Sequence, residues 1–157
     1  MAHSKERQTA DMILAAFNTM DTHRIVSLRT PGCQRVFLPS SLHLTPQSNT
    51  AYLANLNAMK AVFTSFQVTA TDIIEGTSRD DEGRERVKIV MFVEARGETA
   101  VGEYRNDYVW KMGFEEGGGR VDEWIEYVDA SMFRDFYPKL KAETARRAME
   151  KTSDGEK

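Results

Sequence analysis

The spacing of the hydrophobic residues changes after the first 65 positions, from the repeat of a helix to the alternation of a strand. Before this point, three segments carry apolar side chains three or four positions apart. We therefore expect helices that follow Ser4, follow Asp21 and begin near Asn49. Ser4 and Asp21 have the short polar side chains that cap helix N-termini. Residues 33–38 predict a short strand, and residues 39–48 predict a surface loop.

Four segments with the two-residue repeat of strands follow, joined by charged or glycine-rich turns. These segments are 66–74, 85–96, 103–114 and 120–129. Because strands joined by short turns pair with their neighbours, we expect a four-stranded antiparallel meander. Residues 130–137 then predict a short helix. The remainder has strong helix formers but few apolar side chains, which indicates a fraying helix and a loose end.

The strand at 103–114 has one aromatic face and one charged face. Its even positions are Tyr104, Asn106, Tyr108, Trp110, Met112 and Phe114. Since side chains alternate across a sheet, we expect this row to look inward. The order of elements predicts an α+β fold in which a curved antiparallel sheet wraps around N-terminal helices and encloses a cone. We assign residues 1–140 to one domain and residues 141–157 to a helical or disordered charged tail.

Composition narrows the class of protein. Hydrophobic residues make up 41%, charged residues 29%, and the formal charge is −3, which excludes general disorder and disfavours a nucleic-acid partner. The lone Cys33 cannot form an internal disulfide, so a reducing, cytoplasmic setting is expected. We expect neither a signal peptide nor a membrane span, because no stretch approaches the roughly 20 apolar residues that a span needs.

Several short motifs resemble a known family over residues 8–140. They are Arg29-Thr-Pro-Gly-Cys33, Phe37-Leu-Pro-Ser-Ser-Leu42, Tyr104-Arg-Asn-Asp-Tyr108, and Val121 to Asp129 with the ending Phe136-Tyr-Pro138. With the order of elements, they make the chain similar to the SnoaL-like branch of the nuclear transport factor 2-like, or cone-fold, superfamily. The likeness is greatest to small fungal members associated with polyketide and terpenoid pathways.

The resemblance implies a pocket-bearing domain, often dimeric through the outer face of its sheet. Enzymes of the family act as isomerases, cyclases, dehydratases or hydrolases without a metal or an organic cofactor, and other members are non-enzymatic binding or scaffold domains. In the family's polyketide cyclases an Asp on the penultimate strand acts as acid and base. Trp110 stands at the matching position here, which departs from that pattern.

A proton shift without a cofactor needs a base near the reacting carbon and a donor for the developing oxyanion. Glu126 shares a strand face with Trp124 and Val128, so it is a candidate base if that face looks inward. Alternatively, Glu126 pairs with an Arg or Lys of a neighbouring strand. Which face of 120–129 points inward stays open at this stage. Asp129 fits a cap of the following helix better than a catalyst.

Other candidates have equally ordinary alternatives. His43 titrates near neutral pH, although loop histidines are usually exposed. Asn106 is suited to donate to a substrate carbonyl or to satisfy a buried backbone group. Arg35 is suited to bind an acidic substrate group, although an outward ion pair is the commoner arrangement. Four aromatic residues are suited either to line a site for a flat or polycyclic ligand or to pack in the core. They are Tyr52, Tyr108, Trp110 and Trp124.

Two hypotheses follow. The first is a cofactor-independent isomerase, cyclase or dehydratase for a hydrophobic metabolite, in which Glu126 or His43 moves protons and Asn106 or a tyrosine polarises an oxygen. The second is a pocketed binding or dimerisation module without chemistry, with a homodimer interface on the face that bears Glu103, Arg105, Val109 and Lys111. Three widely separated histidines and one cysteine disfavour a zinc site.

Overall fold

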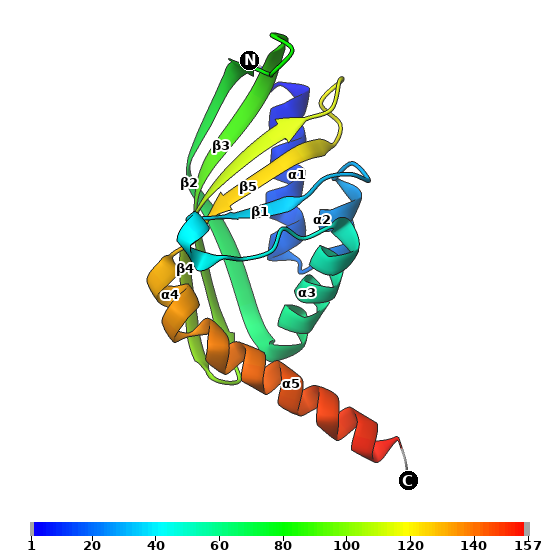
Figure 1. Cartoon of the computed structure of the whole chain (residues 1–157), viewed down its shortest axis with the longest axis vertical. Helices are drawn as coiled ribbons and strands as arrows, with labels where there is room; N and C mark the ends of the chain where they lie inside the picture. The colour runs from blue at the N-terminus through cyan, green and yellow to red at the C-terminus, as the bar shows by residue number, and fades with distance from the viewer. Residues whose placement is uncertain (1, 156–157) are drawn as a thin grey trace.

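The computed structural model describes residues 2–155 and has an α+β architecture (Figure 1). The α-helices are α1 (Lys5–Asn18), α2 (Thr22–Ser27), α3 (Asn49–Val62), α4 (Ala130–Asp135) and α5 (Tyr137–Asp154). A short 3₁₀ helix, η1, spans Ser40–Leu42. The strands are β1 (Arg35–Leu38), β2 (Phe63–Arg79), β3 (Glu85–Thr99), β4 (Gly102–Phe114) and β5 (Val121–Tyr127). This order confirms the predicted helices, strands and fold class.

The strands form one sheet in the order β1-β5-β4-β3-β2. Strands β2 to β5 are the predicted antiparallel meander. The edge strand β1 instead lies parallel to β5, with Arg35 beside Trp124 and Phe37 beside Glu126. The sheet is therefore mixed at this edge, a pairing between distant segments that local patterns do not reveal.

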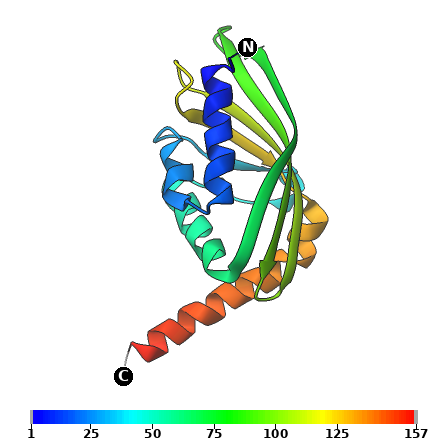
Figure 2. The ribbon, with the colours of Figure 1, turned by 180° about the vertical axis from the view of Figure 1, so that it is seen from behind.

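The helices occupy the concave side of the sheet. Figures 1 and 2 show α1, α2 and α3 together on one side, with α5 crossing the end of the cone below α3. A register shift after Ala70 interrupts the pairing of β2 with β3, and such bulges increase the bend of a strand. The sheet consequently curls around the helices.

Side-chain caps fix several helix boundaries. The Ser4 and Asp21 side chains accept hydrogen bonds from the backbone N–H groups of Arg7 and Arg24, as predicted. The Asp129 side chain accepts from two backbone N–H groups in the first turn of α4, so the predicted capping role is confirmed. Each cap satisfies N–H groups that have no partner within the helix.

The inward faces of the strands form the core. On β4 the residues Tyr104, Asn106, Trp110, Met112 and Phe114 are buried, and Tyr108 is half-buried. On β5 the inward set is Trp124 and Glu126, and Val128 continues it just beyond the strand; all three are buried. The choice left open by the sequence is thus settled in favour of an inward-facing Glu126.

The end of the described chain is helical. Helix α5 runs without a break from Tyr137 to Asp154, and Pro138 lies in its first turn, where no backbone N–H is required. Leu140 is buried, and the Arg147 guanidinium donates to the Ala61 carbonyl of α3 at 2.6 Å. These contacts attach α5 to the domain. Residues 156–157 of the expected tail lie outside the described residues.

None of the helices within residues 2–155 combines the length and the apolar character needed to cross a membrane.

Candidate functional site

A cavity of about 270 Å³ opens between the concave face of the sheet, α3 and the pair α4 and α5. Polar groups gather on its sheet side, and apolar groups come mainly from β1, the segment after η1, and α4. The polar lining residues are Arg35, Thr45, Gln47, Asn55, Tyr104, Asn106, Tyr108, Glu126, Tyr137 and Lys141. The apolar lining residues are Phe37, Leu44, Met59, Val128, Met132 and Phe133.

Glu126 and Arg35 form a bidentate ion pair on the wall of this cavity. Arg35 Nε lies 2.5 Å from Glu126 Oε1, and Arg35 Nη2 lies 3.0 Å from Oε2. Trp124 Nε1 also donates to Oε1 at 2.9 Å. The Glu126 side chain is 1% exposed and that of Arg35 is 12% exposed. A carboxylate with this little solvent contact is stabilised by three directed donors.

The parallel pairing of β1 with β5 makes this contact possible, since it sets Arg35 next to Trp124 and close to Glu126. Sequence analysis favoured an outward ion pair for Arg35. That expectation is wrong, because Arg35 points inward. The alternative that Glu126 pairs with an arginine of a neighbouring strand is confirmed.

Arg35 is held on its other side as well. Its Nη1 donates to Gln47 Oε1 at 3.0 Å and to Asn55 Oδ1 at 3.1 Å. Its guanidinium lies 4.4 Å from the ring centre of Tyr52. Burial is the largest single influence and lowers the Arg35 pKa, but the charge and hydrogen bonds of Glu126, together with Tyr52 and Tyr108, outweigh it and raise that pKa above its usual range. Arg35 is therefore a fixed cation.

A second polar group is a chain of hydrogen bonds along β4. The Asp129 backbone N–H donates to Asn106 Oδ1 at 3.3 Å, and Asn106 Nδ2 donates to Tyr104 Oη at 3.2 Å. Tyr104 Oη lies 2.6 Å from Tyr108 Oη. Either hydroxyl can donate in this contact, and when Tyr104 donates to Tyr108 the Tyr108 hydrogen is left for the cavity.

Tyr104 and Tyr108 keep their protons at neutral pH. Burial raises the pKa of Tyr108 well above its usual value, and the nearby Tyr104 and Glu126 raise it further. Burial also raises the pKa of Tyr104. A tyrosine that holds its proton acts as a hydrogen-bond donor toward a ligand oxygen and not as a base.

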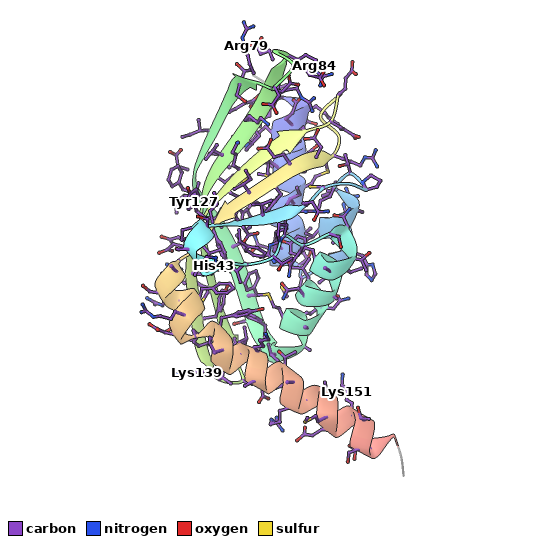
Figure 3. The ribbon with its side chains drawn as sticks, in the orientation of Figure 1. His43, Arg79, Arg84, Tyr127, Lys139 and Lys151 are labelled. Carbon is purple, nitrogen blue, oxygen red and sulfur yellow. The ribbon has the colours of Figure 1, made fainter. Side chains whose placement is uncertain are left out.

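The structure separates the remaining sequence candidates. Tyr52 lies beneath Arg35, outside the cavity lining, and Trp124 lies behind Glu126. Trp110 is buried in the core, with ring centres 5.1 Å from Phe17 and 5.2 Å from Trp124. His43 is exposed where η1 ends and lies outside the lining (Figure 3). Of the named candidates, Arg35, Asn106, Tyr108 and Glu126 share the cavity.

Sequence reasoning missed several contributors to the site. Tyr104 belongs to the inward row of β4 that had been recognised, but its contact with Tyr108 had not. Asn55 follows Tyr52 by three positions on α3, which places both on one face of the helix. Gln47 reaches Arg35 because the two residues also exchange backbone hydrogen bonds of 2.8 and 3.0 Å. Only the last contact lacked a sequence signal.

Across the part of the chain that the structure describes, no three His, Cys, Asp or Glu side chains lie close enough together to hold a metal ion.

Comparison with known proteins finds relatives in fungal biosynthesis. Over 133 residues the chain is 31% identical to austinoid biosynthesis cluster protein S of Aspergillus calidoustus, covering 85% of this chain and 89% of the relative. BvnE pinacolase from Penicillium brevicompactum has a TM-score of 0.71 and 25% identity, covering 90% and 96% of the two chains. No protein-family model matches the sequence.

A more distant structure shows the fold alone. This is a protein described as a SnoaL-like polyketide cyclase, from Shewanella denitrificans, with a TM-score of 0.58 and 13% identity. The alignment covers 85% of this chain and 97% of that one.

Proposed function

Because this chain belongs to the SnoaL-like family of the nuclear transport factor 2-like superfamily and has relatives in fungal biosynthesis clusters, we propose that it is a secondary-metabolite enzyme. Its proposed reaction is isomerisation, cyclisation or dehydration of a hydrophobic polyketide- or terpenoid-like metabolite, without a metal or an organic cofactor. The observation that carries the proposal is a buried carboxylate, Glu126, on the wall of the same cavity as a tyrosine that keeps its proton, Tyr108.

Glu126 is the proposed base. Its Oε1 accepts two hydrogen bonds, from Arg35 Nε and Trp124 Nε1, whereas Oε2 accepts one from the described residues, from Arg35 Nη2. A carboxylate oxygen can accept two hydrogen bonds, so Oε2 has capacity left for a substrate. In this proposal Oε2 takes a proton from a carbon or a hydroxyl group, and Arg35 and Trp124 hold the carboxylate in position.

Tyr108 is the proposed donor. When the proton leaves the substrate, negative charge builds up on an adjacent carbonyl oxygen, and the Tyr108 hydroxyl stabilises that charge. Asn106 and Tyr104 act behind it by fixing the direction of the hydrogen bonds. Return of the proton from Glu126 to a different atom completes an isomerisation. Groups of these kinds typically contribute about 10²- to 10⁴-fold as a base and about 10²- to 10³-fold as an oxyanion donor.

The base is displaced by one strand from the position used in the family's polyketide cyclases. Trp110 occupies that position on β4, and its partner across the β4–β5 pair is Glu126. Directly opposed residues of neighbouring strands have Cβ atoms about 5 Å apart. A carboxylate at Glu126 thus serves nearly the same region of the cone, which supports acid and base chemistry despite the tryptophan.

The walls favour a hydrophobic substrate. Phe37, Met59 and Val128 line the cavity, and Phe133 stacks on Tyr137 with ring centres 4.5 Å apart. The volume of about 270 Å³ lies just below the roughly 300–1,000 Å³ of typical ligand pockets. A compact fused-ring skeleton matches this combination of size and apolar lining better than a long flexible chain.

Turnover of candidate polycyclic ketones by purified protein tests the proposal. Glu126→Gln should lower kcat by at least about 100-fold and Tyr108→Phe by about 10²- to 10³-fold. His43→Ala is the control, because His43 is exposed outside the cavity lining. Unchanged turnover in both cavity variants, or a loss in His43→Ala as large as in Glu126→Gln, would remove the proposal.

A non-catalytic binding or dimerisation module is the alternative function, and the outer face of the sheet favours it. Phe92, Val109 and Tyr127 lie side by side across β3, β4 and β5, and Phe92 and Tyr127 are 42% and 51% exposed. This outer apolar row is the proposed homodimer interface. Binding of ligands without any Glu126-dependent turnover would favour the module over the enzyme.

The cytoplasm is the proposed compartment, since a reducing setting suits a free Cys33. A fluorescent fusion that entered the secretory pathway would contradict this.

A further inference from the structure

The cavity has an unbalanced positive charge at Lys141. Arg35 and Glu126 are the other acidic and basic residues of the lining, and their charges balance in the ion pair. Among residues 2–155, Lys141 forms no ion pair, whereas Glu143, Arg146 and Arg147 on the same helix pair with one another. The lining therefore carries a net charge of +1, located on α5.

Arg35 is poorly placed to balance a substrate charge itself. A guanidinium has five N–H donors. Arg35 already directs two to Glu126, one to Gln47 and one to Asn55, and its charge is matched by the carboxylate. Lys141 is exposed, and its ammonium has three donors that no described residue accepts. A ligand anion would therefore find its counter-ion at Lys141.

We propose that the substrate is a hydrophobic carboxylic acid whose carboxylate binds Lys141, while its reacting part lies at Glu126 and Tyr108. The inference rests on the proposed function, because it takes this cavity as the substrate site. Apolar side chains of α4, Met132 and Phe133, also line the cavity. In such a setting one charged contact fixes the orientation of the ligand, since turning it around would leave the carboxylate without a counter-ion.

Lys141 is then a specificity-determining residue and takes no part in proton transfer. The protein should therefore bind acids about tenfold more tightly than their neutral esters, which is the difference expected from one partly exposed charge-assisted hydrogen bond. Because Lys141 is exposed, the preference should shrink at high salt. Lys141→Met should abolish the preference and leave binding of the neutral ester unchanged.

The probes for this test are 9-anthracenecarboxylic acid and its methyl ester, which share a flat tricyclic skeleton and differ in charge. Binding to the wild-type protein, Lys141→Met, Lys141→Arg and Lys139→Met would be followed by quenching of the tryptophan fluorescence at neutral pH. Lys139 is the matched control: it is exposed on the same helix, carries the same charge and lies outside the cavity lining (Figure 3).

We expect the wild-type protein, Lys141→Arg and Lys139→Met to prefer the acid and Lys141→Met to bind both probes equally. The inference is overturned if the wild-type protein shows no preference or binds neither probe. A preference that survives in Lys141→Met, or one that is lost to the same extent in Lys139→Met, would also overturn it. These outcomes are independent of the proposed chemistry, which is tested by turnover in Glu126→Gln.

Discussion

At the scale of single residues, the site depends on how one carboxylate is kept inside the protein. Burying a charge costs several kcal/mol unless hydrogen bonds and an opposite charge offset it. For Glu126, Arg35 supplies both, and Trp124 supplies a third donor. Gln47 and Asn55 hold Arg35 in turn. The position of the base therefore depends on residues from β1, β5, α3 and the segment that precedes α3.

Removing Arg35 should therefore damage the fold and not only the site. Arg35→Met leaves Glu126 buried without its counter-ion, and we expect a loss of about 3 to 5 kcal/mol in the free energy of unfolding, measured by urea denaturation. The double variant Arg35→Met/Glu126→Leu should recover part of this loss, because no unpaired charge remains. A double variant at least as unstable as Arg35→Met would contradict this reading.

The buried Tyr52, which lies beneath Arg35, should make the free energy of unfolding fall at alkaline pH. Burial raises its pKa from 10.0 to about 12, against the opposing effect of Arg35. Between about pH 10 and 12 the unfolded chain loses this proton while the folded protein keeps it, so stability is full below pH 10 and falls as the pH rises. The contribution lost is about 2 to 3 kcal/mol.

Tyr52→Phe should remove this part of the pH dependence. The urea-unfolding free energies of the wild-type protein and the variant should differ by a constant amount up to about pH 9. Between pH 10 and 12 the wild-type protein should lose about 2 to 3 kcal/mol more than the variant. Parallel curves over the whole range would show that Tyr52 titrates normally.

At the scale of elements, the alternation along β4 was enough to predict its inward face. Tyr104, Asn106 and Trp110 all proved to be buried, since strict alternation leaves two choices and hydrophobicity selects one. The caps at Ser4, Asp21 and Asp129 were also predictable, because each acts within a few residues of itself.

Contacts between distant elements could not be predicted in this way. The Arg35–Glu126 pair depends on the parallel register of β1 with β5, across 91 residues of sequence. No local pattern specifies that register. The contribution of Lys141 to the cavity was missed for a related reason: the sequence indicated a fraying helix and then a loose tail after Pro138, whereas α5 packs against α3.

Helix α5 offers a test at this scale. Leu140 is 2% exposed, so Leu140→Ala should lower the free energy of unfolding by about 2 to 4 kcal/mol and speed amide hydrogen exchange along α5. Met149 on the same helix is 75% exposed, and Met149→Ala should change stability by less than about 0.5 kcal/mol. Equal effects of the two substitutions would mean that α5 does not depend on its buried contact.

At the scale of the whole molecule, one curved sheet presents two different surfaces. Its concave face carries the cavity, and its convex face carries the outer apolar row of Phe92, Val109 and Tyr127, of which Tyr127 is labelled in Figure 3. Apolar side chains grouped on an outer surface are typical of interaction sites. The two functions proposed for the fold, chemistry and self-association, thus use opposite faces of the same strands.

Self-association should respond to the outer row alone. Phe92→Glu places a charge in the proposed homodimer interface, so sedimentation equilibrium should show a dimer for the wild-type protein and a monomer for the variant. Ile74→Glu is the control, because Ile74 on β2 is 51% exposed but lies outside the row. A wild-type monomer, or dissociation of both variants, would contradict the assignment of this interface.

The central claim is that Glu126 moves protons inside the cone. Incubation of the protein in D₂O with a fused-ring ketone, followed by mass spectrometry, measures this directly as deuterium incorporation beside the carbonyl. The account predicts incorporation by the wild-type protein and by His43→Ala, and a rate at least about 100-fold lower with Glu126→Gln. Incorporation by Glu126→Gln at the wild-type rate would contradict it.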